Sequence, residues 1–211
     1  ACFIFDYHIF MKLSCQCSVL SFNGYLIVFA DLNINAGTAT ATVQGIGAYA
    51  GTITAPYSIA RAAAMVTAKA ASKTYGDVDP ELEAQVSGLV GDDTIEYALA
   101  RAEGEHVGEY AITPSGVAEQ GNYTVTYVPG TFTINPAEVT VTADDQSKVY
   151  GDDDPELTAT VEGLIGGDTV EYTLSRAEGE DPGEYAITPA GEAEQGNYTV
   201  TFVPGTLTIS K

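Results

Sequence analysis

Clustered carboxylates are the residues of this chain whose types and spacing could do chemistry. Asp77 and Asp79 lie in one short segment, which returns 75 residues later with a carboxylate added, as Asp152, Asp153 and Asp154. Aspartates held in a rigid turn could bind Ca²⁺, which takes about six to eight oxygen ligands. The EF-hand spacing is absent, and aspartate beside proline is also ordinary turn chemistry. The pattern predicts turns, with a calcium site as the alternative and no other cofactor.

Two lysines just before these segments raise a second chemical alternative. Lys73 and Lys148 occupy equivalent positions in a chain that has only 8 lysines and arginines. A lysine, an asparagine and a carboxylic acid buried together can form an intramolecular isopeptide bond, for which Asn122 and Asn197 are the candidate asparagines. The other interpretation is that each lysine pairs with surface carboxylates. The isopeptide would need the lysine to be buried, which is costly unless that bond forms.

No group of residues predicts a catalytic site. Catalysis needs a nucleophile, a base and an orienting group that converge in a pocket. The two histidines are His8 and His106, and the second is replaced by Asp181 in the repeated segment. Arg101 and Arg176 also recur, and we expect each to pair with a neighbouring glutamate rather than with a ligand. The sequence therefore predicts a protein that is not an enzyme.

The composition excludes several classes of partner. The chain has 29 acidic and 8 basic side chains, a formal net charge of −21. A nucleic-acid binder needs a basic surface, and anionic membrane surfaces repel an acidic chain. No apolar run reaches the roughly eighteen residues of a membrane-spanning helix, so we expect neither nucleic acid nor membrane insertion. All cysteines lie near the start, so disulfides cannot hold the rest together and their pairing stays open: Cys2, Cys15 and Cys17.

An internal repeat organises the chain. Residues 75–134 align with 150–209 without a gap, and 45 of the 60 positions are identical. The same spacing makes residues 1–61 a shorter, degenerate first unit without the Tyr-Gly-Asp segment. We therefore predict three domains, at 1–61, 62–136 and 137–211, of which the last two share one fold.

Within each complete unit the apolar residues alternate with a period of two, which predicts strands. Residues 138–142, 169–175 and 197–202 alternate in this way and are rich in threonine, valine and tyrosine. Residues 80–85 could pass for a helical turn, but their counterpart 155–161 is rich in β-formers, so both are predicted as strands. About six or seven short strands per unit predict an all-β chain of small β-sandwich domains, arranged end to end.

Three motifs recur in both complete units. They are Tyr-Gly-Asp-x-Asp-Pro-x-Leu at 75–82 and 150–157, a Gly-Leu-x-x-x-Asp-Thr turn, and Gly-Asn-Tyr-x-Val-Thr at 121–126 and 196–201. In these motifs the chain resembles the MBG-type (YGX) bacterial immunoglobulin-like repeats. The resemblance implies Ig-like domains of secreted or surface-anchored bacterial proteins, usually long tandem arrays or adhesins, and it implies no catalytic residues.

The first residues are the most open part of the sequence. Four apolar side chains would share one face of a strand: Phe3, Phe5, Tyr7 and Ile9. Two further apolar strands flank Asn23-Gly24, a strong hairpin signal. Three interpretations compete: a secretion signal from Met11, ordinary strands of a divergent domain, or a strand donated into the incomplete first domain of another copy. Head-to-tail strand exchange would not close on itself and would build a fibre.

Together with these features, the resemblance implies a non-enzymatic extracellular structural module of a bacterial surface protein. It would be a stalk or spacer of an adhesin, or a building block of a surface filament, with neighbouring repeats as its partners. The first alternative is a filament subunit that polymerises with other copies of itself by donating its N-terminal strand. The second is an adhesin that binds a glycan or a host protein through residues 1–61, because a unique ligand site needs residues that break the repeat.

Overall fold

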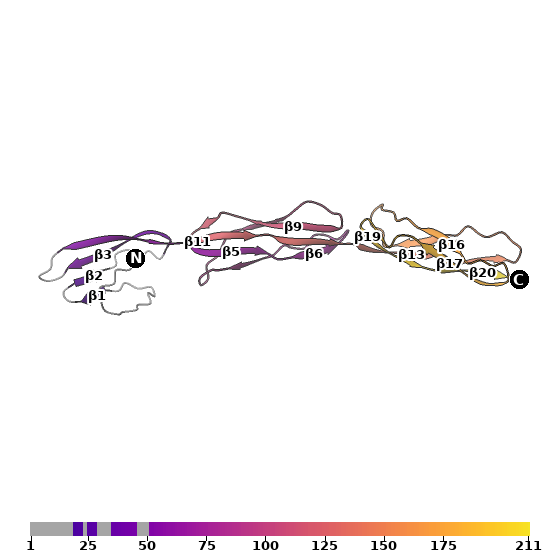
Figure 1. Ribbon diagram of the computed structural model, residues 1–211, viewed down its shortest axis with the longest axis horizontal. Coiled ribbons are helices and arrows are strands. Elements are labelled where there is room, and N and C mark those ends of the chain that lie inside the picture. Colours follow the sequence, from indigo (N-terminus) through magenta and orange to yellow (C-terminus); the bar gives the residue numbers. More distant parts are fainter. Residues whose placement is uncertain (1–18, 23–24, 29–34, 46–50) are drawn as a thin grey trace. The chain divides into compact units, whose positions relative to one another are not determined.

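Strands make up all the regular elements that the structure describes (Figure 1). It is a computed structural model that describes residues 19–22, 25–28, 35–45 and 51–211, with side chains described for 35–40 and 51–211. The all-β prediction is confirmed. In this part of the chain no helix is long and apolar enough to cross a membrane. The apolar strand predicted at Phe3, Phe5, Tyr7 and Ile9 lies outside the described residues.

The chain divides into two compact units whose limits do not follow the repeats. One comprises residues 1–67, 85–98 and 114–128, and the other comprises 68–84, 99–113 and 129–211. The second repeat is thus shared between the units, whereas the third repeat lies wholly in the second unit. The three predicted domains at 1–61, 62–136 and 137–211 stay predictions.

The first unit is built around two sheets. One is antiparallel, in the order β1-β2-β3-β4, and the other has the order β10-β11-β5-β7. Their strands are β1 (Val19–Phe22), β2 (Tyr25–Val28), β3 (Gly37–Gly45), β4 (Thr52–Ile59), β5 (Ala62–Ala68), β7 (Ala84–Ser87), β10 (Glu119–Gln120) and β11 (Tyr123–Val128). Phe22 lies opposite Tyr25, so β1 and β2 pair as the Asn23-Gly24 signal predicts.

The second unit holds three sheets. Their orders are β6-β12-β9-β8, β15-β13-β19-β18 and β14-β20-β17-β16, and the last two form the third repeat. Their strands are β6 (Ala71–Thr74), β8 (Ala98–Arg101), β9 (Gly108–Ser115), β12 (Gly130–Asn135), β13 (Ala137–Ala143), β14 (Gln146–Val149), β15 (Ala159–Glu162), β16 (Thr173–Arg176), β17 (Gly183–Ala190), β18 (Glu194–Gln195), β19 (Tyr198–Val203) and β20 (Gly205–Ser210).

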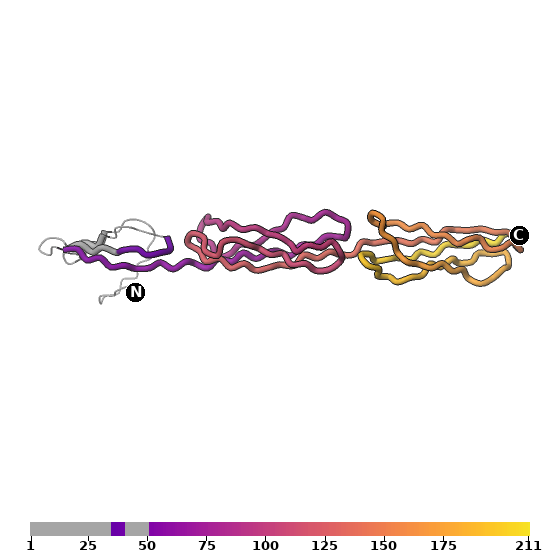
Figure 2. Tube along the Cα trace, turned by 90° about the horizontal axis from the view of Figure 1, so that it is seen from above, coloured from indigo at the N-terminus to yellow at the C-terminus, as the bar shows by residue number. Residues whose placement is uncertain are grey.

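The first two strands of the third repeat run parallel to its last two strands. β13 pairs with β19 from Ala137 opposite Tyr198, and β14 pairs with β20. Pro204 separates β19 from β20, and because proline has no N–H the ladder breaks there and the chain changes sheets. Both views show these extended segments, in orange to yellow, running along one direction (Figures 1 and 2). The chain therefore enters the repeat at one end and leaves it at the other.

Alternating burial places the core of the third repeat between its two sheets. On β13 every second side chain is buried, and Val139 and Val141 lie in one cluster with Tyr198. Ile187 and Leu207 lie in another. β17 of one sheet lies against β13 and β19 of the other. The threonines that alternate with the valines face outward, as a half-buried pleated surface requires.

Two strand predictions were wrong in extent. Residues 80–85 and 155–161 were expected to be strands, but the strands begin only at Ala84 and Ala159. Pro155 has no N–H for a ladder, and Leu157 packs against the core from an irregular segment. Each complete repeat has eight strands rather than six or seven, because breaks such as Pro204 divide runs that alternate in the sequence.

Candidate functional site

A nearly buried lysine lies at the centre of a cluster of carboxylates in the third repeat. The Lys148 side chain is 4% exposed, and its Nζ donates to Asp154 at 2.7 Å, Glu180 at 2.6 Å and the Asp152 carbonyl at 3.2 Å. In the second repeat Lys73 is 5% exposed and is paired with Asp79, at 2.8 Å, and with Glu105. A lysine that is removed from water needs such partners, and both repeats supply them.

An arginine completes each cluster. Arg176 bridges Asp154, at 2.7 Å from its Nε, and Glu180, and its Nη1 donates to two loop carbonyls. Arg101 bridges Asp79 and Glu105 in the same way. The glutamate pairing expected for both arginines is present. The two cations therefore attach the Asp-Pro segment and the loop after β8 or β16 to the core.

These contacts shift the protonation of the carboxylates. Arg101 and then Lys73 lower the pKa of Asp79 to about 2, below its ordinary 3.8. The same two cations, Lys73 first, lower the pKa of Glu105, and the carboxylates raise the pKa of Lys73. Both clusters thus favour their charged forms at neutral pH, as structural ion pairs do.

The predicted calcium ligands are divided by these ion pairs. Asp79 and Asp154 are each neutralised by a lysine and an arginine, whereas Asp77, Asp152 and Asp153 are exposed in the turns. The described residues contain no group of three or more histidine, cysteine, aspartate or glutamate side chains that could hold a metal. The calcium site stays a prediction, with two of its carboxylates already paired.

The isopeptide candidates each have other hydrogen-bond partners in the structure. Lys148 Nζ contacts only oxygens of its own cluster in the bonds given above, whereas the Asn197 side chain accepts from the Val107 N–H at 2.9 Å. Asn122 accepts from the Ala36 N–H at 2.7 Å, and Lys73 is held by its own carboxylates. Both asparagines thus make hydrogen bonds outside the lysine clusters, and the isopeptide bond stays a prediction.

The Gly-Asn-Tyr motif forms a junction at the start of each complete repeat. The Asn197 carbonyl accepts from Ala137, the first residue of β13, at 2.9 Å, while its side chain reaches back to Val107 and His106 in the preceding repeat. Asn122 does the same in the first unit. Its carbonyl accepts from Ala62, and its side chain contacts Asn35 and Ala36. One motif thus binds its own first strand and the preceding segment.

A tyrosine–aspartate pair lies beside this asparagine in the third repeat. The Tyr198 hydroxyl donates to Asp168 at 2.6 Å and accepts from the Ile165 N–H at 3.0 Å. Tyr75 of the preceding repeat donates to the same Asp168 carboxylate at 3.0 Å. Its ring meets the ring of Tyr198 edge-on, with 5.5 Å between centroids. These two hydrogen bonds lower the pKa of Asp168, and the carboxylate raises the pKa of Tyr75.

The linker between these repeats is held on both sides. The Asn135 carbonyl accepts from the Tyr75 N–H at 2.8 Å, and the Ala137 N–H donates to the Asn197 carbonyl at 2.9 Å. Pro136 alone separates Asn135 from Ala137 and has a restricted φ. Gly76 approaches the other side of the junction so closely that a Cβ there would lie 2.5 Å from Ile165 Cδ1. The second unit therefore joins the two repeats without a free linker.

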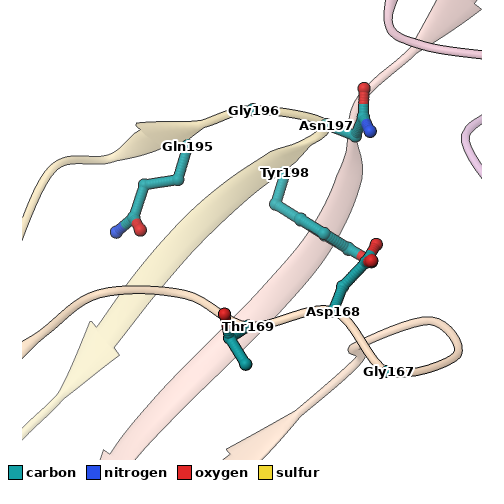
Figure 3. Close-up of a pocket in the computed structure, with 7 residues that line it drawn as sticks. All are labelled: Gly167, Asp168, Thr169, Gln195, Gly196, Asn197 and Tyr198. Carbon is teal, nitrogen blue, oxygen red and sulfur yellow. The ribbon is translucent and has the colours of Figure 1, made fainter.

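A shallow polar depression adjoins the junction. Its lining residues are Gly167, Asp168, Thr169, Gln195, Gly196, Asn197 and Tyr198. Figure 3 shows Tyr198 reaching to the Asp168 carboxylate, while the Asn197 side chain points away from that pair. Tyr198 is buried, so it contributes its hydroxyl rather than an exposed ring on which a sugar could stack.

Sequence reasoning missed the residues that make this junction. Asp168, Tyr75 and His106 were not singled out for it, although Asp93 and Asp168 recur at one position of the repeat. That recurrence was the available signal. It could not indicate that Tyr75 and Asp168, 93 residues apart, share a hydrogen bond.

Comparison with known proteins supports the family. None of the curated proteins compared with this chain matches it. Among solved structures, the crystal structure of Drosophila N-cadherin EC1-4 aligns with 82% of this chain at 9% identity and a TM-score of 0.25, and the alignment spans 58% of that structure's own chain. The MBG domain (YGX type) matches residues 64–133 and 139–208, well over half of the sequence, in two tandem copies. Because both matches cover the all-β repeats described above, this chain belongs to the YGX-type MBG domain family and consists in large part of tandem β-sandwich domains of that type.

Proposed function

We propose that this chain is a non-enzymatic structural module of a bacterial surface protein, a spacer whose repeats are joined stiffly in series. The observation that carries the proposal is the junction around Pro136. The residue on each side of this proline is hydrogen-bonded to a different repeat, and Tyr75 crosses to Asp168. Such a joint restricts the motion of one repeat relative to the next, as a stalk requires.

Two further features support the proposal. The parallel pairing of β13 with β19 brings the chain in at one end of the repeat and out at the other, so repeats can follow one another without a return connection. The recurring side-chain clusters are occupied by internal ion pairs, as in the set of Lys148, Asp154, Arg176 and Glu180. Because the two complete repeats are nearly identical, the second copy lengthens the chain rather than adding a different kind of site.

Stiffness can be measured across Pro136. Spin labels would be placed at cysteines substituted for Glu109 and Glu184, which are exposed and equivalent in β9 and β17, with the natural cysteines changed to serine. We expect pulsed electron paramagnetic resonance to give a narrow distribution of distances between the two spin labels. The control carries a flexible Gly-Ser insertion after Pro136 and should give a broad one. Equal breadth in the two chains would contradict a stiff spacer.

Surface location needs its own test. Protease added to intact cells that produce the protein should release peptides from residues 62–211, while a cytoplasmic marker stays intact. Release only after lysis would contradict an extracellular role. The adhesin alternative, with a glycan or host protein bound through residues 1–61, would require binding that is lost when that segment is removed.

A filament subunit is the second candidate, and β4 favours it. Among the strands that the structure describes, β4 pairs with β3 alone, and its side chains Thr52–Ser58 are exposed, including Ile53 and Tyr57. An open apolar edge can accept a strand from another copy. Electron microscopy would compare the full chain with one that begins at Asn33. Fibres from the full chain alone would support strand donation, and monomers from both would exclude it.

A further inference from the structure

The two complete repeats carry the same tyrosine in different surroundings. Tyr75 is half-buried against Tyr198 and bonded to Asp168, whereas its counterpart Tyr150 is 59% exposed. Gly76 lies against Ile165, but a Cβ at its counterpart Gly151 would meet no atom within 4 Å. Tyr150 and Gly151 thus present, uncovered, the surface that Tyr75 and Gly76 use to hold the next repeat.

The complementary face is also found twice. In the third repeat it consists of Ile165, Asp168 and Tyr198, and it is filled by Tyr75 and Gly76. In the second repeat Tyr123 donates to Asp93 and accepts from the Val90 N–H in the same way, yet Val90 is 68% exposed and Asp93 is exposed as well. Residues 1–61 lack the Tyr-Gly-Asp segment that would cover that face.

We infer that Tyr150 and Gly151 form a docking surface for a further YGX-type repeat, and that this repeat binds through an aspartate–tyrosine face like that of Asp168 and Tyr198. The occupant must offer a carboxylate as acceptor for the Tyr150 hydroxyl and a ring edge-on to it. It must also offer an apolar side chain at the Ile165 position, which lies close to Gly76 in the filled junction. These are the contacts that the Tyr75 junction already makes.

The second contact of the junction would differ. At the filled junction Val107 donates its N–H to Asn197, and His106 contacts the same side chain. The equivalent residues of the third repeat are Asp181 and Pro182. Proline has no N–H, so the bond that Val107 donates has no counterpart there, and the Asp181 carboxylate can accept from the amide of the incoming asparagine. The Tyr150 surface therefore depends more on the tyrosine–aspartate bond than the Tyr75 junction does.

The test uses the full chain and the same chain extended by a second copy of residues 137–211. Placing Ala137 directly after Lys211 keeps the 75-residue period. The appended copy carries Tyr150→Phe, which distinguishes its peptide by mass. Acetylation of tyrosines by N-acetylimidazole, read by mass spectrometry, should modify Tyr150 readily in the natural chain and Tyr75 slowly. In the extended chain, modification of Tyr150 should fall towards the rate of Tyr75.

Two variants sharpen the result. Asp168→Ala in the appended copy alone should return Tyr150 to its rate in the natural chain, with thermal unfolding used to verify that the copy is folded. Asp181→His with Pro182→Val in the natural repeat should slow modification of Tyr150 further. Unchanged reactivity of Tyr150 in the extended chain, or protection that survives Asp168→Ala in a folded copy, would overturn the inference. The inference rests on the proposed spacer role but fails separately, because the distance measurement across Pro136 does not involve Tyr150.

Discussion

The hydroxyl of Tyr75 donates to the carboxylate of Asp168 at 3.0 Å, although 93 residues separate them in the chain. Asp168 accepts at the same time from Tyr198, the aromatic residue of the Gly-Asn-Tyr motif. One carboxylate thus receives a tyrosine from each of two consecutive repeats. This shared acceptor is the central contact of the junction.

Removing one hydroxyl should loosen the junction. We expect Tyr75→Phe to broaden the label distance distribution across Pro136, because the ring contact remains but the bond to Asp168 is lost. Tyr150→Phe is the matched control, since it removes the same atom from an exposed side chain. The bond favours the protonated phenol and raises the pKa of Tyr75 above 10, so the junction should also loosen as the pH rises past that raised value. Identical distributions for both variants would contradict the assignment.

Acid should weaken the ion-pair clusters in a defined pH window. Because the pKa of Asp79 is lowered to about 2 in the folded chain, its contribution to stability is complete above the ordinary value of 3.8 and is lost as the pH falls towards 2. Thermal unfolding between pH 7 and pH 2 should therefore show a falling Tm. Asp79→Asn should lower the Tm at pH 7 and flatten this dependence. Asp77→Asn serves as the control, because Asp77 is exposed in the same turn and the ion pairs given for that turn are made by Asp79.

A side chain at Gly205 should destabilise the third repeat. A Cβ at this position would collide with the backbone of Ala143, which cannot move as a flexible side chain could. Gly205→Ala should cost about 1–3 kcal/mol of the free energy of unfolding, the usual range for overpacking. Gly183→Ala is the control, because its nearest atom is the Asp181 carbonyl oxygen at 3.9 Å. Chemical denaturation that gives equal stabilities for the two variants would refute the close approach.

The core of the third repeat should be sensitive to truncation at Ile187. This side chain is fully buried in the cluster with Leu207 and Ile209. Ile187→Ala should lower the free energy of unfolding by about 2–5 kcal/mol, through lost burial and the cavity left behind. Val149→Ala, at a position that is 49% exposed, should have little effect in the same denaturation experiment.

Intact mass decides between the lysine clusters and the isopeptide alternative. Because Lys148 is paired with carboxylates and the Asn197 side chain is bound to Val107, we expect the calculated mass with no loss of ammonia. Lys148→Ala should then leave the carboxylates Asp154 and Glu180 with one cation fewer and lower the Tm. A mass deficit of one ammonia per bond would contradict the separate roles given to these residues.

Local patterns were sufficient for much of the architecture. The period of two in residues such as 138–142 follows from the pleat of a strand, so the all-β fold could be read from the chain alone. The pairing of each arginine with a glutamate was also predictable, since Arg176 and Glu180 are four residues apart. Strand limits were less certain, because Pro155 and Pro204 divide runs that alternate without interruption in the sequence.

The repeat, the strand-rich fold and the excess of acidic side chains follow from the amino-acid sequence, because they depend on composition and on neighbours a few residues apart. The folded arrangement was needed to see that the Asn197 side chain accepts from Val107 of the preceding repeat, and that Tyr75 and Asp168 meet while the identical Tyr150 stays exposed. Tyr75 and Tyr150 lie in the same sequence motif, so no local pattern distinguishes them. Their environments differ because the fold brings Asp168, 93 residues away in the chain, beside Tyr75, whereas Tyr150 stays exposed.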